Sequence, residues 1–270
     1  MLKYSGQRAF NVARHAAREL VVFSKLERLV AAVCMGTPFF LILADSQDKI
    51  NFWPIAFGTF TIMAIPLIVS LAAYKIYGMA TLRNGILAFV SAFILVAILF
   101  YIWYQTLPAN FIVRDSISSY VSMKNAQIFG LLLTSASMLF LFNGAVYINT
   151  VPEISSKKHG KWYNLVLGIS LLGVVLFPCT NPKLEVFHYS CAILFFAGGA
   201  FVIAFFNNEE HRIISIIIAG ISLLGFVVYL SNTIWLKSAA LSSFSLFWAE
   251  TIALWVIGIH YILESLGELS

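Results

Sequence analysis

Long apolar segments recur along almost the whole chain and restrict the folds that are open to it. Eight segments approach the roughly 20 apolar residues that a helix needs to cross the hydrocarbon core of a bilayer. They cover approximately residues 29–44, 52–74, 85–107, 127–150, 162–179, 187–206, 213–236 and 241–263. Their apolar residues are continuous rather than alternating, which argues against the strands of a membrane barrel. The sequence therefore predicts an all-α polytopic membrane helical bundle of about eight transmembrane helices.

The composition agrees with this prediction. Only 11% of the residues are charged, compared with about 25% in soluble domains. The three cysteines form no CxxC pair, and the five histidines show neither HxxxH nor HExxH spacing. We therefore expect no disulfide framework, no metal site and no cofactor. The net charge of +5 is spread over short separate loops, so we also expect no nucleic-acid partner.

The distribution of Lys and Arg predicts the orientation of the spans. If the N-terminus is cytoplasmic, the non-cytoplasmic loops carry five of the 17 basic residues and the cytoplasmic side carries the other 12. The five are Lys49, Arg114, Lys124, Lys183 and Lys237. This asymmetry is in the sense of the positive-inside rule. Both termini are therefore expected in the cytoplasm.

Residues 1–28 are basic and amphipathic. Arg14, Arg18 and Lys25 recur on one helical face, and apolar residues recur on another. This pattern predicts an interfacial helix that lies on the cytoplasmic membrane surface and contacts anionic head groups. The alternative is a cytoplasmic extension that packs on the loops of the protein itself.

Glu250 is the clearest polar residue within a predicted span. It lies about nine residues into the last span, near mid-membrane and on the outer side in the predicted orientation. A carboxyl there must be protonated, paired or exposed to a polar cavity. Glu250 is thus either a proton, cation or substrate site, or a neutral side chain bonded to a neighbouring helix. His188 opens the sixth span and is expected in the same half of the membrane.

Other polar residues are expected near this depth and complete a set of ligand-binding candidates. They are Arg114, Asp115, Ser116, Ser119, Ser231, Asn232 and Trp248. Interfacial hydration is the alternative explanation for each of them. A Ser–His–Asp triad can be drawn from such residues, but no Gly-x-Ser-x-Gly elbow is present. We assign no catalytic residue and favour a protein that is not an enzyme.

Four short motifs characterise the last two thirds of the chain. A long outer loop contains residues 114–119, and a basic inner loop precedes a span that ends at Pro178. A span that His188 opens runs into a Phe- and Gly-rich stretch, and the final span carries Glu250 close to Trp248. In these features residues 85–265 resemble the six-span Frag/DRAM/Sfk superfamily and its bacterial six-span relatives of unknown function.

The resemblance implies a division of the chain and a setting. Residues 85–266 would form a six-helix transmembrane core, residues 29–84 two additional transmembrane helices, and residues 1–28 the basic helix in front of them. Some members are linked to remodelling of lipid anchors and to membrane lipid asymmetry, so the resemblance implies work on or with membrane lipid. The bacterial relatives favour a bacterial inner membrane.

Three functions remain open on the sequence. The first is an integral membrane protein that binds a lipid or small ligand in a polar pocket of the outer half. The second is a proton- or cation-coupled transporter that uses Glu250. The third is a non-catalytic structural or assembly subunit, with a membrane-protein partner or a second copy of the chain.

Overall fold

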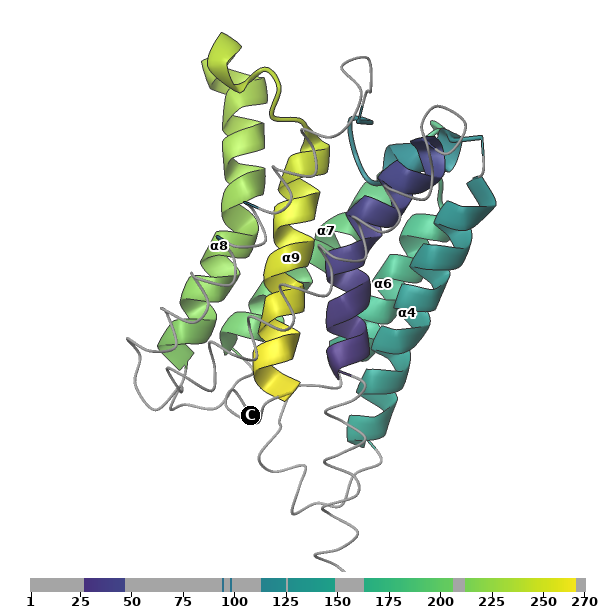
Figure 1. The fold of residues 1–270 in the computed structure, drawn as a ribbon, viewed down its shortest axis with the longest axis vertical. Coiled ribbons are helices and arrows are strands. Elements are labelled where there is room, and N and C mark those ends of the chain that lie inside the picture. The colour runs from purple at the N-terminus through teal and green to yellow at the C-terminus, as the bar shows by residue number, and fades with distance from the viewer. Residues whose placement is uncertain are drawn as a thin grey trace, which may run out of the picture.

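A computed structural model describes residues 27–46, 94, 98, 113–124, 126–148, 163–205 and 212–265. The predicted N-terminal basic helix up to residue 26, the predicted span 52–74 and nearly all of the predicted span 85–107 lie outside the described residues. Every regular element in the described part of the chain is helical. These helices run alongside one another as a bundle (Figure 1).

Five of the described helices are long and apolar enough to cross a membrane. They are Glu27–Ser46, the first 19 residues of α4 (Ala126–Ile148), α7 (Glu185–Phe205), α8 (Arg212–Ser231) with its π-helical extension Asn232–Leu236, and the first 18 of α9 (Leu246–Ser265). The apolar helix α6 (Tyr163–Leu176) is shorter, with 14 residues. The helical, membrane-compatible part of the prediction is thus confirmed. The total of eight spans and their orientation stay predictions.

Two helix ends differ from the predicted ones. α6 ends at Leu176, two residues before Pro178, because a proline disfavours helical geometry at the residue that precedes it. α9 begins at Leu246, five residues after the predicted start of the last span. Glu250 is therefore the fifth residue of its helix, close to the N-terminal end rather than near the middle.

The connection before α9 explains the late start of this helix. Lys237 adopts left-handed backbone angles, with φ at 44°, and its N–H donates to the carbonyl of Asn232 at 2.8 Å. The Asn232 side chain accepts from Ser238 N at 2.9 Å and donates to Leu241 O at 3.3 Å. A short 3₁₀ turn, Ala239–Leu241, then leads towards α9. Apolar residues of this connection extend the hydropathy signal beyond the helix itself.

Helix α9 and the helix Glu27–Ser46 are the most enclosed elements. In the most apolar stretch of each helix, 83% of the residues of α9 and 67% of those of Glu27–Ser46 are buried. The corresponding share is at most 33% in α4, α7 and α8. In Figure 1, α9 runs between α8 and the purple helix Glu27–Ser46. A Cβ atom at Gly258 would lie 2.6 Å from Met35 Cγ and 3.1 Å from Ala31 O, so these two helices approach closely. The interior of the bundle is thus built around α9.

Helices α4 and α6 also pack through small residues. A Cβ atom at Gly144 would lie 2.7 Å from the backbone nitrogen of Leu165. One at Gly168 would lie 2.9 Å from the carbonyl oxygen of Ser137, whose hydroxyl in turn donates to Gly168 O at 2.7 Å. Small residues allow such close approach of helix backbones in membranes.

We predict that Gly144→Ala destabilises the protein, since the added methyl group meets backbone that cannot rotate away. The expected loss is about 1–3 kcal/mol, typical of an overpacked core. Gly130→Ala is the matched control on the same helix, because nothing lies within 4 Å of a Cβ atom there. Thermal unfolding in detergent should show a lower Tm for Gly144→Ala and an unchanged or higher Tm for Gly130→Ala. Equal Tm values would contradict the close α4–α6 contact.

Candidate functional site

Residues 113–124, which we call the cap segment, lie at the end of the bundle where α9 begins. Within it, residues Ser118–Ser122 form a 3₁₀ helix. Ile117, Tyr120 and Met123 are buried, so the segment inserts apolar side chains into the bundle. Burial raises the pKa of the Tyr120 hydroxyl well above its usual value, and this side chain is neutral at any working pH.

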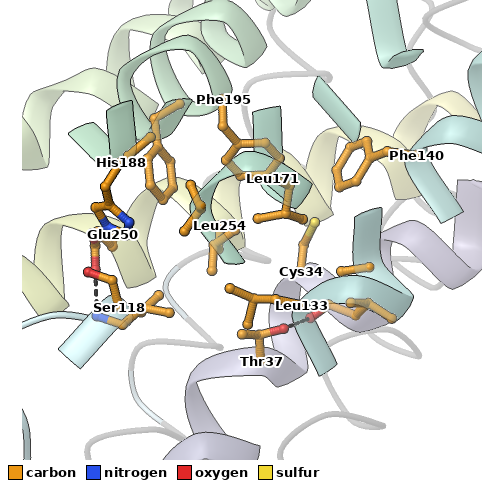
Figure 2. A pocket seen from close by; sticks show the side chains of 16 residues that line it. Cys34, Thr37, Ser118, Leu133, Phe140, Leu171, His188, Phe195, Glu250 and Leu254 are labelled. Carbon is orange, nitrogen blue, oxygen red and sulfur yellow. Dashed lines mark hydrogen bonds between the residues drawn. The ribbon is translucent and has the colours of Figure 1, made fainter. Parts of the chain in front are cut away.

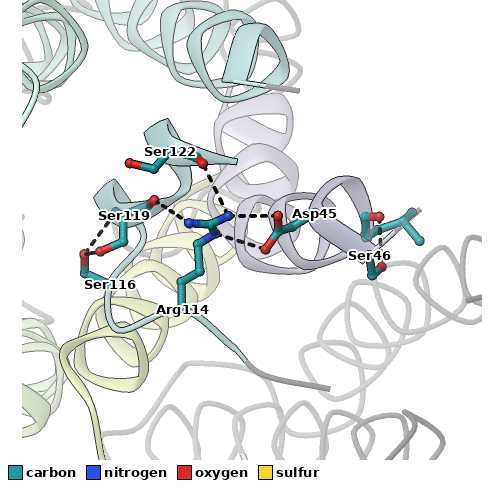
Figure 3. Close-up of polar contacts among 7 residues, drawn as sticks. Asp45, Ser46, Arg114, Ser116, Ser119 and Ser122 are labelled. Atoms are coloured by element: carbon teal, nitrogen blue, oxygen red, sulfur yellow. Dashed lines mark hydrogen bonds and ion pairs between the residues drawn. The ribbon is translucent and has the colours of Figure 1, made fainter. Parts of the chain in front are cut away.

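Arg114 ties the cap segment to the helix Glu27–Ser46 (Figure 3). Its Nε and Nη2 donate to the two carboxylate oxygens of Asp45, both at 3.0 Å. Its remaining hydrogen bonds, at 3.4 and 3.5 Å, reach the carbonyl oxygens of Ser119 and Ser122. The hydrogen bond to Asp45 raises the pKa of Arg114, so the guanidinium remains charged at all working pH values.

Two hydrogen bonds join the cap segment to the start of α9. The first backbone N–H groups of a helix have no partner within the helix. Here Phe247 N donates to the carbonyl of Asp115 at 2.7 Å. One turn further, the carboxyl Oε2 of Glu250 accepts from Ile117 N at 2.6 Å. Glu250 therefore satisfies a backbone donor of the cap segment, and only 6% of its surface is exposed.

His188 pairs with a backbone group at the end of α6. It lies in the first turn of α7, is 2% exposed, and its Nδ1 is 2.8 Å from the carbonyl oxygen of Phe177. Phe177 directly follows the last residue of α6, where carbonyl groups lack partners within the helix. Because a carbonyl only accepts, the proton of this bond is on Nδ1. In neutral His188 the other nitrogen, Nε2, is thus an acceptor.

Glu250 and His188 meet at one cavity of about 50 Å³ (Figure 2). The helix Glu27–Ser46, the cap segment, α4, α6, α7 and α9 all contribute to its lining. Glu250, His188 and Ser118 lie at one end in Figure 2, and Phe140 lies at the other. Most of the wall is apolar, with Leu133, Phe140, Leu171, Phe195, Phe196 and Leu254 among its residues.

Each of the two ionisable side chains has one polar atom committed to the backbone and one that is not. Glu250 Oε2 is bonded to Ile117 N and His188 Nδ1 to Phe177 O. Within the described part of the chain, Glu250 Oε1 and His188 Nε2 have no protein hydrogen-bond partner. These two atoms are available to a molecule in the cavity.

The other candidates in the cap segment lie around this site rather than in it. Arg114 is bonded to Asp45, and Asp115 acts through its backbone carbonyl. The hydroxyl of Ser116 lies 3.1 Å from that of Ser118 and 2.7 Å from that of Ser119. These serines shape the turn that presents Ile117 and Ser118 to the cavity.

The candidate residues near the end of α8 and the start of α9 also lie outside the cavity. Asn232 organises the turn before α9 through the bonds described above, and Ser231 is the last residue of α8. Trp248 stacks edge-on against Phe247, with ring centroids 5.2 Å apart. None of the three lines the cavity. Arg14, Arg18 and Lys25 lie outside the described residues.

Three contributors were not anticipated from the sequence. Asp45 ends the first span but pairs with a residue 69 positions away, which sequence proximity cannot reveal. Cys34 and Thr37 line the cavity from the same helix. Their spacing of three residues on one helical face was the available signal. Across the described residues, no three His, Cys, Asp or Glu side chains come together as a metal site would require.

Comparisons with known proteins give one match. The model of a family described as "Family of unknown function (DUF7103)" matches residues 36–265. No curated protein and no solved structure matches the chain. The match covers the cap segment, α4 to α9 and the greater part of the helix Glu27–Ser46. It does not bear on the Frag/DRAM/Sfk resemblance, which stays a prediction.

We predict that Arg114→Ala loosens the cap segment, because the ion pair and both carbonyl contacts are lost. Hydrogen–deuterium exchange at the amides of Ser119, Tyr120 and Met123 should accelerate about threefold to tenfold. These amides are bonded within the cap segment in the native structure. Lys183→Ala removes an exposed basic residue between α6 and α7 and serves as the control. An unchanged exchange rate in Arg114→Ala would show that the ion pair does not hold the cap segment.

Proposed function

We propose that this chain, which belongs to the DUF7103 family of unknown function, is an integral membrane protein that binds a lipid or small ligand in the cavity beneath its cap segment. One observation carries the proposal. A buried carboxyl group and a buried imidazole each present one uncommitted polar atom at the same mainly apolar cavity.

A purely structural role accounts for only one of the two polar atoms of Glu250 and of His188. The bond to Ile117 N explains Glu250 Oε2, and the bond to Phe177 O explains His188 Nδ1. Leaving a buried polar atom unsatisfied costs about 1–3 kcal/mol, and more if it is charged. Glu250 Oε1 and His188 Nε2 are not among the fully buried polar atoms of the described residues that lack a partner. Both side chains line the cavity, where a bound molecule or water can supply their hydrogen bonds. The surrounding aromatic and aliphatic side chains favour an apolar portion in the same molecule.

The proposal includes a membrane setting. Five membrane-length apolar helices support insertion into a bilayer. With the predicted cytoplasmic N-terminus, the cap segment and the cavity would lie in the outer half of the bundle. The protein would then meet its lipid from the outer leaflet, in a bacterial inner membrane. The role of an assembly subunit is based on the aromatic-rich spans and on the basic N-terminal helix, residues 1–28, which lies outside the described part up to residue 26. It stays a prediction.

A proton- or cation-coupled transporter is the second candidate, and a polar layer deeper in the bundle favours it. Tyr261 donates to the side-chain oxygen of Asn164, and both are buried together with Asn143 and His260. The ring of Phe140, which lines the cavity, lies edge-on to that of Tyr261, with centroids 5.9 Å apart. The cavity already combines two uncommitted polar atoms, so the binding role is the better supported of the two.

We predict that Glu250→Gln separates the structural role of this residue from its binding role. The glutamine oxygen can still accept from Ile117 N, so the Tm should remain within a few degrees of the native value. Recovery of the co-purifying ligand, measured by native mass spectrometry, should fall about tenfold or more, because one hydrogen bond to the carboxyl group is lost. Glu250→Ala should lose both the ligand and stability.

Glu185→Gln provides the control for this experiment. It also removes one carboxylate from the same end of the bundle, at the exposed start of α7. Its ligand content and Tm should equal those of the native protein. Full ligand recovery in Glu250→Gln would contradict the binding role of this carboxyl group.

A further inference from the structure

With Glu250 ionised and His188 neutral, the polar side chains of the cavity are acceptors. Glu250 is bonded through Oε2, so as a carboxylate it offers the lone pairs of Oε1. Neutral His188 offers Nε2, because its proton lies on Nδ1 towards Phe177 O. These are two strong acceptors from two helices, α9 and α7, at the same end of one cavity.

A third polar side chain of the cavity also offers only a lone pair. The hydroxyl of Thr37, on the helix Glu27–Ser46, donates its only hydrogen to the carbonyl of Val33 at 2.7 Å. What it can offer the cavity is therefore again a lone pair. The hydroxyl of Ser118 is engaged with Ser116 at 3.1 Å, and the thiol of Cys34 is a weak donor. In this protonation state the cavity therefore lacks a strong side-chain donor that is uncommitted.

The size of the cavity limits the polar group that it can hold. A water molecule needs about 10–15 Å³ of such space, so 50 Å³ accommodates only a few non-hydrogen atoms. A phosphate with its substituents fits this space less closely than a smaller group does. It suits a hydroxyl or ammonium group with the first carbons of an attached chain, in contact with Leu171, Phe195 and Leu254.

Building on the proposed function, we propose that Glu250 is ionised and His188 neutral in the bound state, that the ligand is an amphiphile whose small head group is a hydrogen-bond donor, an alcohol or an amine, and that carboxylate and phosphate head groups are rejected. Glu250 Oε1 and His188 Nε2 receive the head-group hydrogens. An anionic head group would place further acceptors against these two atoms and leave all of them unsatisfied, which is a strong source of discrimination.

The test uses the full chain in phosphatidylcholine nanodiscs and four probes of equal chain length: 1-decanol, decylamine, decanoate and decyl phosphate. Apparent affinity is measured from the probe-dependent rise in Tm. The native protein should bind decanol or decylamine about tenfold or more tightly than decanoate or decyl phosphate, the difference expected for one buried hydrogen bond. The variants and the native protein are compared at the same probe content of the nanodisc, so that differences between the probes in membrane partitioning cancel.

Two variants change the acceptors while they keep the structural bonds. In His188→Asn, the side-chain NH₂ can replace Nδ1 as donor to Phe177 O, but no group replaces Nε2. The preference for the donor probes should fall about tenfold. In Glu250→Gln, the oxygen keeps the bond to Ile117 N and the NH₂ group turns towards the cavity. Its preference should shift towards decanoate, a change in specificity that a merely structural residue would not produce.

The outcomes separate the two proposals. Binding of decanoate or decyl phosphate as tight as that of the donor probes, at a site that Glu250→Gln and His188→Asn still weaken, overturns the donor assignment and leaves the cavity as a ligand site. If no probe raises the Tm of the native protein more than that of these variants, both the donor assignment and the proposed binding function are overturned. Glu185→Gln should respond to every probe as the native protein does.

Discussion

The buried carboxyl group of Glu250 links α9, the cap segment and the cavity. Glu250 is the fifth residue of α9, which is the most enclosed helix, and it receives the Ile117 N–H of the cap segment. That bond and the bond from Phe247 N to Asp115 O hold the cap segment over the end of the bundle. The Arg114–Asp45 ion pair fixes its other side. Because only one carboxyl oxygen is used in this way, the other remains for the cavity.

His188, on α7, likewise uses one polar atom to bond the backbone and keeps the other at the cavity. One nitrogen completes the hydrogen bonding of the α6 end at Phe177, and the other is left at the cavity. Buried polar groups in an apolar bundle are costly unless they are satisfied. For stability alone, each position needs only the one polar atom that pairs with the backbone, Glu250 Oε2 with Ile117 N and His188 Nδ1 with Phe177 O. Glu250 and His188 each keep a second polar atom at one small cavity. This is consistent with a site that binds part of its ligand through hydrogen bonds.

The sequence predicted the helices and the two central side chains, because both leave strong local signals. Continuous apolar runs mark the spans, and Glu250 and His188 are conspicuous within them. The sequence did not predict which polar residues share a site. Asn232 has the same predicted depth as Glu250 but forms the turn that delays the start of α9, and apolar residues of that turn concealed the helix boundary. Asp45 and Arg114 are paired only by the fold, as are Thr37 and the cavity.

An experimental density map of the protein in lipid nanodiscs is the most direct test of the cavity as a ligand site. We expect density for a small head group within hydrogen-bond distance of Glu250 Oε1 and His188 Nε2, continued by an apolar chain along Phe195 and Leu254. The bonds from Ile117 N to Glu250 and from His188 to Phe177 O should be present in the same map. A cavity closed by side chains, with both uncommitted atoms bonded to the protein itself, would contradict the proposed function.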